Sequence, residues 1–386
     1  MILEFVSPKS IVHGAGARKE LLNQVGRLGS NHVLFVTDSY IMNTGLITEL
    51  AQPLLDAGVN VSVFSQVQPD PTVENVREGF EMLQSSHADV IVAVGGGSAI
   101  DAAKAISVLS TNPEPLSQYM GYHKIPNAGL PLIAIPTTAG TGSEATMVTV
   151  ISDSETNIKM MILDHHLMPT VAIVDFELSI SMPPALTAHV GVDTLTHAIE
   201  AYVSVKANAM TDHIALSCID LVTKNLFSAW SDPSDATARR AMSVAACQGG
   251  MSFTNSSVAL VHGMSRPLGI LFHLAHGLSN AILLPAVTRF SVEGAKDRYA
   301  TIARVMDLAT TNDSDEKASM ALVMGLEKMN SKLKIPKLRD CTTFSRAYLE
   351  QHVFKMAEDA LNSGSPQNNP KIPTIAEIVE LYKEAW

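Results

Sequence analysis

The stretch Val92-Ala93-Val94-Gly95-Gly96-Gly97-Ser98-Ala99-Ile100-Asp101 decides the class of fold, because it joins a short apolar run to three glycines and then to a helical pattern. The apolar run is typical of a buried strand, and the glycines permit a tight turn into a helix whose first turn starts at Ser98. The unpaired N–H groups and the dipole at such a helix start can bind a phosphate. Many strand-to-helix turns use glycine for steric reasons alone, so this stretch by itself does not establish phosphate binding.

Similar apolar runs recur through the first half of the chain and alternate with amphipathic segments. This alternation predicts a parallel sheet whose strands are joined by crossover helices. Helices are expected from Pro71 onward and over residues 98–109. The expected strands, of which the last two form an extended pair on either side of Lys159, are residues 32–37, 59–64, 89–94, 130–135, 147–151 and 171–174.

The pattern changes after Met182-Pro183-Pro184, where the strand-like runs stop and a helical period of 3.6 residues begins. The expected helices of this part are residues 185–203, 211–229 and 236–253. We therefore expect an α/β domain with a parallel sheet at residues 1–180 and an all-helical domain at residues 181–386. A cleft between two domains is a common place for a site, and we expect the site there.

Composition narrows the classes of function. A formal net charge of -11 and a pI near 5.6 disfavour binding to nucleic acid or to an anionic membrane, so small-molecule chemistry is expected. The three cysteines lie far apart and form no CxxC motif, which favours a reducing, cytoplasmic location. Residues 267–288 contain no charged side chain, but histidines, prolines and glycines interrupt this stretch, which argues against a membrane span.

A second loop with the features of a phosphate site follows the strand expected at residues 130–135. It reads Pro136-Thr137-Thr138-Ala139-Gly140-Thr141-Gly142-Ser143-Glu144 and offers hydroxyl groups and N–H donors, so the two loops together suit a pyrophosphate and its riboses. Asp38 ends the first expected strand, where a carboxylate favours NAD over NADP because it accepts hydrogen bonds from a ribose and repels a 2′-phosphate. A turn or helix N-cap aspartate is the structural alternative. The chain lacks the usual GxGxxG fingerprint.

Four residues have the types and spacings of a divalent metal site: Asp193, His197, His262 and His276. Asp193 and His197 stand four apart, so on a helix their side chains leave the same face. His262 and His276 each precede a glycine, where the missing side chain would let another group approach the imidazole and leave an open face. A single histidine is more often structural, and only the joint pattern indicates a site. Three imidazoles and one carboxylate suit Fe(II), Zn(II), Co(II) or Ni(II) without selecting one.

Together these motifs closely resemble those of the iron-containing (group III) alcohol dehydrogenases, over most of the chain. The motifs that carry the resemblance are residues 95–98 with Asp101 and Lys104, then 136–144, 191–193, 197–202, 262–264, 276–277 and 378–382. The resemblance implies a dinucleotide-binding α/β domain, a helical metal domain and hydride transfer between NAD(H) and a small primary alcohol or diol and its aldehyde. We also expect the enzyme to be a homo-oligomer.

The resemblance further implies a role for individual residues. Asp193, His197, His262 and His276 would be the metal ligands and the catalytic centre, with Fe²⁺ as the expected ion and Zn²⁺ as the alternative. The residues expected to bind the nicotinamide-adenine dinucleotide are Asp38, Gly96, Gly97, Ser98, Asp101, Thr137, Thr138, Thr141, Thr146 and Lys159.

The chain departs from the family pattern at three places. Asp70 stands where many relatives carry asparagine near the cofactor. Arg266 stands where many carry a histidine four residues after the third metal ligand, and it would bind an anionic substrate group such as a carboxylate, sulfonate or phosphonate, or else form a structural salt bridge or helix-end contact. Residues 362–370 differ from the usual cysteine-containing segment.

The sequence also supports expectations for five further side chains. We expect His273 to line the pocket or support a ligand, Lys104 to be a helix-surface or packing lysine, and Glu144 to stabilise its loop. His189 and His213 are expected to be structural.

Two other classes of protein share some of these features. A metal- and NAD-dependent cyclising lyase of the dehydroquinate-synthase type resembles this family distantly, but it would need more basic residues near the four ligands to hold a phosphorylated substrate. A non-enzymatic, metal-dependent binding protein is the third possibility, and oxidation of NADH with small aldehydes would distinguish it from the dehydrogenase.

Overall fold

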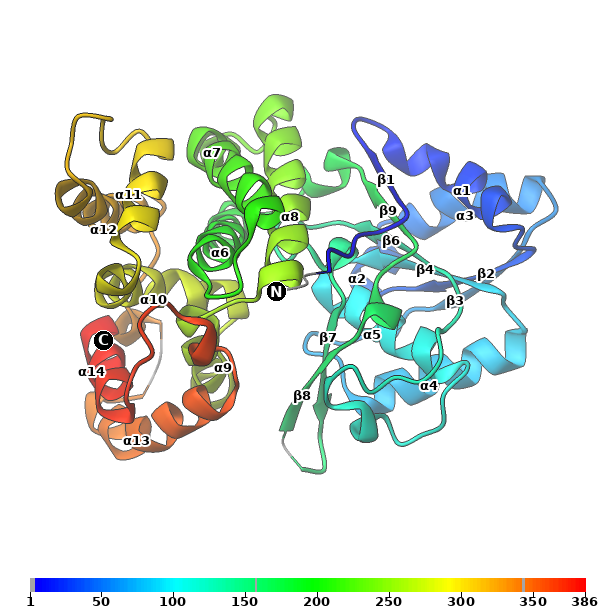
Figure 1. Ribbon diagram of the computed structural model, residues 1–386. Coiled ribbons are helices and arrows are strands. Elements are labelled where there is room, and N and C mark those ends of the chain that lie inside the picture. The colour runs from blue at the N-terminus through cyan, green and yellow to red at the C-terminus, as the bar shows by residue number, and fades with distance from the viewer. Residues whose placement is uncertain (1–3, 157, 342–343) are drawn as a thin grey trace. The chain divides into compact units, whose positions relative to one another are not determined.

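The computed structural model describes residues 4–156, 158–341 and 344–386. The chain divides into two compact units, Met1–Ser181 and Met182–Trp386. The first unit is a sheet covered by helices and the second is built from helices (Figure 1). The predicted class of fold is therefore confirmed.

A six-stranded parallel sheet organises the first unit, in the strand order β1-β9-β6-β4-β2-β3. Its strands are β1 (Ser10–His13), β2 (His32–Val36), β3 (Asn60–Phe64), β4 (Val90–Gly95), β6 (Leu132–Pro136) and β9 (Val171–Val174). The strands predicted from apolar runs are present within one or two residues of their expected bounds. Strand β1 was not predicted, because its residues are only half-buried or exposed and give no apolar run.

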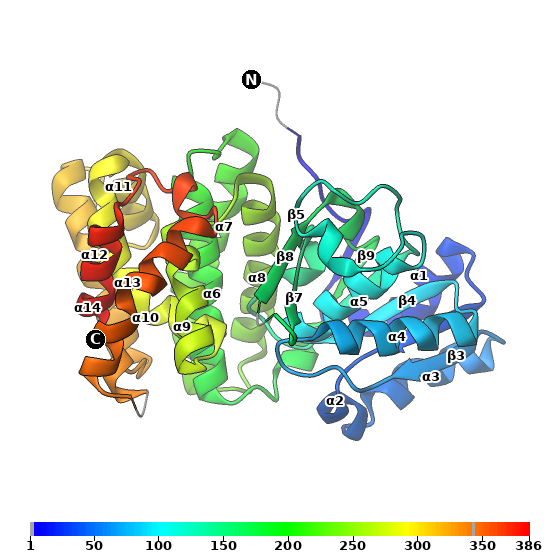
Figure 2. The ribbon, with the colours of Figure 1, turned by 90° about the horizontal axis from the view of Figure 1, so that it is seen from below.

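Helices cover both faces of this sheet, as strands buried on both sides require. Alternate residues of β2 show the division: Leu34 and Val36 belong to the core under one pair of helices, while Val33 and Phe35 belong to the core under the three helices of the opposite face. The first pair is α4 (Val73–Ser86) and α5 (Gly97–Leu109), and the helices of the opposite face are α1 (Leu21–Leu28), α2 (Ser39–Asn43) and α3 (Leu46–Asp56) (Figures 1 and 2).

The first unit also contains a smaller sheet. Strands β5 (Gly121–Tyr122), β8 (Ile158–Leu163) and β7 (Val148–Asp153) pair in that order, with β7 antiparallel to β8. The two extended segments predicted on either side of Lys159 are both strands: residues 147–151 correspond to β7 of this smaller sheet, and residues 171–174 are β9 of the main sheet. Strand β8 carries Lys159 and two methionines instead of a β-branched run, which explains why its pattern was not recognised.

The topology of the main sheet gathers three connections at one edge. Asp38 follows β2, the three-glycine turn follows β4, and Thr137 follows β6, and all three strands are parallel. The chain runs from β2 to β3 on one side and returns to β4 on the other side of β2, so the strand order reverses between β2 and β4. Open α/β sheets bind ligands beyond the carboxyl ends of the strands at such a point.

The described residues of the second unit form only helices and turns. The long helices are α6 (Pro184–Val203), α7 (Ala209–Ser231), α8 (Ala236–Ser256), α9 (Leu260–Phe272), α10 (His276–Ser291), α11 (Lys296–Val305), α12 (Asp315–Lys332), α13 (Arg346–Asn362) and α14 (Ile375–Ala385). Helices α6 to α8 match the three predicted segments. Proline at the first turn of α6 and a capping box at the start of α7 explain where these helices begin.

Residues 273–275 separate α9 from α10 and so interrupt the charge-poor stretch at residues 267–288. Within the described part of the chain, no helix combines the length and the apolar character that crossing a membrane requires.

Candidate metal centre and nucleotide loops

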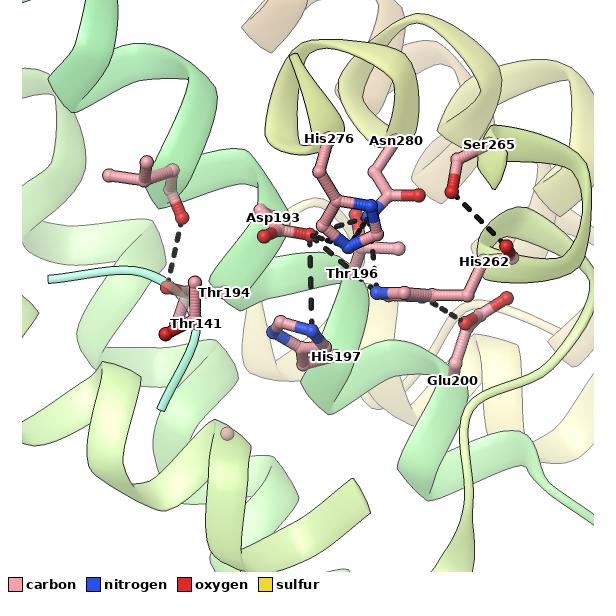
Figure 3. A network of polar contacts seen from close by, with 12 residues as sticks. Thr141, Asp193, Thr194, Thr196, His197, Glu200, His262, Ser265, His276 and Asn280 are labelled. Carbon is pink, nitrogen blue, oxygen red and sulfur yellow. Dashed lines mark hydrogen bonds and ion pairs between the residues drawn. The ribbon is translucent and has the colours of Figure 1, made fainter. Parts of the chain in front are cut away.

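Four side chains of the helical unit converge on one point, and we call them the ligand quartet: Asp193, His197, His262 and His276 (Figure 3). Asp193 Oδ1 lies 3.9 Å from His197 Nε2, 3.6 Å from His262 Nε2 and 3.9 Å from His276 Nε2. Four tetrahedral bonds of about 2.1 Å would separate ligand atoms by about 3.4 Å. The quartet therefore fits a divalent cation after a contraction of a few tenths of an ångström.

Three helices supply the quartet. Asp193 and His197 leave α6 one turn apart, as predicted, while His262 comes from α9 and His276 is the first residue of α10. The imidazole of His197 stacks on the phenyl ring of Phe253 and on the imidazole of His262, with ring centroids 4.5 Å and 4.6 Å away. His276 is the most accessible member, because its side chain is 49% exposed whereas the other three are buried.

The two glycines that follow ligands have a different role from the predicted one. A Cβ at Gly277 would lie 2.9 Å from the carbonyl oxygen of His189, and a Cβ at Gly263 would lie 2.8 Å from Cγ of Pro366. Both glycines therefore let other parts of the helical unit pack closely against α9 and α10. The prediction that they leave open faces beside the imidazoles is wrong, because main chain and a proline fill that space.

Glu200 is a functional residue that the sequence analysis did not assign. Its buried carboxylate accepts hydrogen bonds from the main-chain N–H groups of Ala259 and Val261, at 2.9 and 2.6 Å, and from Nδ1 of His262 at 2.6 Å. Because Nδ1 carries the donated proton, the lone pair of His262 is on Nε2, which faces the quartet. The signal that could have indicated this role is a glutamate three residues after a ligand, in the largely apolar last turns of α6.

The charge of Asp193 is favoured by its neighbours. Burial opposes ionisation of this carboxyl, but the three imidazoles and a hydrogen bond from Asn280 outweigh burial and lower its pKa below the ordinary value. Asp193 is therefore an ionised carboxylate at neutral pH, the form that binds a cation.

Two neighbouring side chains lie outside the quartet. Arg266, one turn after His262 on α9, is half-buried, and its Nη1 donates to the carbonyl oxygen of Ser363 at 3.5 Å. His273 is the exposed C-cap residue of α9, with a φ of 54°, and its ring is not among the groups that converge.

The two loops predicted to bind phosphate pack against each other at the carboxyl edge of the sheet. A Cβ at Gly97 would lie 3.0 Å from Cγ2 of Thr141, and a Cβ at Gly96 would lie 3.6 Å from the side chain of Thr138. Gly95 has a φ of 153°, and a Cβ there would lie 2.7 Å from the Cβ of Ala99. The turn therefore requires glycine, and α5 begins at Gly97, one residue before its predicted start.

Asp38 caps a helix and also lies beside the glycine turn. Its Oδ1 accepts a hydrogen bond of 2.8 Å from the main-chain N–H of Ile41, as the structural alternative for this residue predicts. Its Oδ2 lies 3.5 Å from the position of a Cβ at Gly95. The carboxylate is thus held in one orientation at the point where the strand order reverses.

A buried polar network joins α5 to the second loop. Lys104 Nζ donates to Ser143 Oγ and Thr146 Oγ1, both at 2.9 Å, and to the carbonyl oxygen of Val148 at 2.7 Å. Asp101 accepts from Ser143 Oγ at 2.7 Å and from the N–H of Val150 at 2.9 Å. Lys104 is fully buried, so the helix-surface reading is wrong and the packing reading holds. Asp101, Ser143 and Thr146 are members of this network, and their hydrogen bonds fix the loop.

Lys159 forms an ion pair that the sequence analysis did not predict. Its Nζ lies 2.9 Å from Oδ1 of Asp70, the residue that stands where many relatives have asparagine. Asp70 is in the left-handed region with a φ of 54° and is exposed, whereas Lys159 is more sheltered. The departure at residue 70 therefore places a negative charge against a lysine expected to contact the cofactor.

Glu144 gives the loop a pH-dependent stability. Burial raises the pKa of this carboxyl from 4.5 to about 7. Between pH 4.5 and 7 the unfolded chain loses a proton that the folded chain keeps, so the wild type loses stability relative to Glu144→Gln as pH rises through this range. The difference in Tm between the two proteins, measured by calorimetry from pH 4 to 8, should grow up to about pH 7 and then level off.

The exposed Glu78 on α4 provides the control, because Glu78→Gln should follow the wild type across the same range. A Tm difference for Glu144→Gln that stays constant with pH would contradict the raised pKa.

Comparison with known proteins identifies the family. A family model described as iron-containing alcohol dehydrogenase matches residues 8–176, and one described as Fe-containing alcohol dehydrogenase family, C-terminal, matches residues 187–386. The chain is 35% identical over 381 residues to the NAD-dependent methanol dehydrogenase of Bacillus methanolicus, covering 99% of both proteins.

Two solved structures extend the comparison. One described as 1,3-propanediol oxidoreductase matches with a TM-score of 0.96 and 34% identity over 100% of both chains. The sulfoacetaldehyde reductase from Bifidobacterium kashiwanohense, in complex with NAD+, matches with a TM-score of 0.87 and 28% identity over 100% of this chain and 98% of that one. These matches confirm the resemblance and decide against the cyclising lyase and the non-enzymatic binding protein. The chain belongs to the iron-containing alcohol dehydrogenase family, whose members are metal-dependent oxidoreductases that interconvert alcohols and aldehydes.

Proposed function

We propose that this enzyme transfers a hydride between NAD(H) and a small primary alcohol or diol and its aldehyde, with the ligand quartet holding the catalytic cation. The observation that carries the proposal is the convergence of one carboxylate and three imidazoles within 4.8 Å of one another. Fe²⁺ is the ion that the family name indicates, and Zn²⁺ suits the same donors.

The cation would supply a Lewis acid for the substrate oxygen, and the nicotinamide would accept or deliver the hydride. The chain's own residues orient these groups. Glu200 fixes the ring of His262, and stacking on Phe253 fixes the ring of His197, so little reorganisation is needed for the quartet to act. The exposed edge of His276 is the side from which we propose that substrate approaches.

For the cofactor, the chemistry of the carboxyl edge supports an NAD site. The start of α5 offers main-chain N–H groups to a pyrophosphate, and the hydroxyl-rich loop after β6 packs against it. The residues at this edge that we propose contact the cofactor directly are Asp38, Gly96, Gly97, Ser98, Thr137, Thr138 and Thr141. Lys159 would contact the cofactor from β8, while Asp101 and Thr146 would act by holding the loop, because their polar atoms bind Ser143, Val150 and Lys104.

Replacing Asp38 should relax the choice of cofactor. In Asp38→Gly the carboxylate that would repel a 2′-phosphate is gone, so kcat/KM for NADP should rise by about tenfold or more relative to NAD. The ratio is measured with one alcohol and both cofactors. Because Asp38 also caps α2, Asp38→Ser is the matched control: it keeps a cap and removes the charge, and it should relax the preference in the same way. Unchanged preference in both variants would show that Asp38 does not face the ribose.

The substrate class is the next part of the proposal. The named relatives act on methanol, 1,3-propanediol and sulfoacetaldehyde, so both neutral and anionic small substrates occur among them. We propose that Arg266, which lies one turn from His262 on α9, binds an anionic substrate group, because a guanidinium pairs well with a carboxylate or a sulfonate.

A panel of neutral and anionic aldehydes, assayed by NADH oxidation with and without a chelator, tests the proposed function. We expect turnover with small aldehydes that the chelator abolishes. Failure to oxidise NADH with any of them would contradict the proposal. A preference for anionic aldehydes that Arg266→Ala removes would support its role in substrate binding, and an Arg266→Ala variant that keeps the wild-type preference would refute it.

A reducing, cytoplasmic location and a homo-oligomeric state complete the proposal. The cysteines support the location, since Cys218 and Cys247 are buried and all three described cysteines are free thiols. Light scattering on the purified enzyme tests the oligomeric state.

A further inference from the structure

Asn280 is a fully buried polar residue at the quartet that neither the sequence analysis nor the proposed mechanism uses. It lies on α10, one turn after His276, and is followed by Ala281, Ile282 and Leu283. Asparagine is a weak helix former, and burying its amide is costly unless the amide is hydrogen-bonded. Neither the stability of the helix nor the packing of the core therefore explains an asparagine at this position.

The amide nitrogen of Asn280 points at three members of the quartet. Nδ2 donates to Asp193 Oδ1 at 2.6 Å and lies 3.1 Å from His262 Nε2 and 3.2 Å from His276 Nε2 (Figure 3). The opposite orientation of the amide would place two oxygens 2.6 Å apart, which electrostatic repulsion disfavours. Its Oδ1 accepts no hydrogen bond from any residue that the structure describes, so the side chain is held through its nitrogen.

The bond to Asp193 is the contact that matters most for a cation. Oδ1 of Asp193 is the carboxylate oxygen that lies closest to the three imidazoles, and it is also the oxygen that accepts from Asn280. A carboxylate oxygen has more than one lone pair, so it can accept from an amide and still face a cation. The imidazole of His262 is already fixed by Glu200, whereas Asp193 has its described side-chain hydrogen bond only from Asn280.

We propose that Asn280 is a positioning residue of the metal centre, which orients Asp193 Oδ1 towards the three imidazoles and thereby raises the affinity of the quartet for its cation. Asn280 does for the carboxylate what Glu200 does for His262. This inference rests on the proposed function, because it requires that the quartet bind a cation at all.

Asn280→Leu, which keeps the volume and removes the donor, tests the proposal. With Zn²⁺ or Co²⁺ alone as the probe, competition against a chelator should show binding about 10- to 100-fold weaker than in the wild type. The visible spectrum of the Co²⁺-loaded variant should also differ, because the geometry of the Asp193 carboxylate changes. Neither result is expected of a residue that only packs the core.

Asn225 provides the matched control. It is a half-buried asparagine on α7 whose Nδ2 donates to the carbonyl oxygen of Leu221 at 2.8 Å. Asn225→Leu therefore also removes a hydrogen bond made by the side-chain amide of a helical asparagine. This control should bind the cation within about twofold of the wild type. Should Asn280→Leu fail to fold, Asn280→Ala removes the same donor without added branching and is judged by the same two readouts.

The outcomes separate the two proposals. Cation affinity of a folded Asn280 variant within twofold of the wild type overturns the positioning role and leaves the proposed function standing. A wild type that binds neither Zn²⁺ nor Co²⁺ contradicts the metal centre itself.

Discussion

His262→Ala is expected to lose its bound cation and its turnover together while remaining folded. The change removes one of four ligands, so binding should weaken by more than the roughly 10- to 100-fold that loss of a supporting residue causes. Turnover should fall by at least the same factor, because the substrate oxygen loses its Lewis acid. Elemental analysis gives the metal per chain, steady-state kinetics give turnover, and circular dichroism checks the fold.

His213→Ala is the control for this experiment. His213 is an exposed helical histidine of the same unit whose Nδ1 contacts the carbonyl oxygen of Ala209, and it lies outside the quartet. The control should retain about one metal ion per chain and normal turnover. Full turnover by a metal-free His262→Ala protein would refute the assignment of the site.

Glu200→Gln should weaken both the metal centre and the helical unit. The carboxylate accepts three hydrogen bonds, whereas an amide has one oxygen and would turn its NH₂ group towards at least one of the three donors. Each buried donor left without an acceptor costs about 1–3 kcal/mol, so Tm should fall by several degrees. Cation affinity should fall about 10- to 100-fold, because the ring and the tautomer of His262 are no longer fixed.

Calorimetry of the metal-free protein and chelator competition measure the two effects separately. The exposed Glu350 on α13 pairs with Arg346, and Glu350→Gln should change neither quantity measurably. A Glu200→Gln protein with wild-type affinity would show that the hydrogen bond to His262 Nδ1 is dispensable.

The elements and ligands that could be predicted from the sequence depend on residues that are close together along the chain. The glycine turn after an apolar run predicts the strand and helix on either side of it, since strand, turn and helix are set by neighbouring residues. The four-residue spacing of Asp193 and His197 predicts a shared helix face for the same reason. By contrast, the sequence could assign ligands from α6, α9 and α10 to one site only because the residue types together resemble the pattern of a known family.

The residues that the sequence missed depend on contacts between distant segments. For Lys104 the sequence left a surface and a packing position open, because its partners Ser143, Thr146 and the Val148 carbonyl are about 40 residues away along the chain. Asn280 reads as an ordinary helical asparagine until α10 packs against α6 and brings it to Asp193.

The glycines after His262 and His276 were misread for the same reason. Gly263 packs against Pro366, and Gly277 packs against the main chain of His189. Both neighbours are distant in sequence, so no local pattern reveals them. Local patterns therefore predict the elements and the ligands, while the groups that support the ligands require the packed structure.

Titration of the metal-free wild type with Fe²⁺ under anaerobic conditions, with turnover measured at each addition, tests the central claim most directly. We predict that metal-free enzyme is inactive with NADH and a small aldehyde, and that turnover rises linearly to a plateau at about one ion per chain. Full turnover before any cation is added, or a plateau that does not depend on the quartet, would contradict the account.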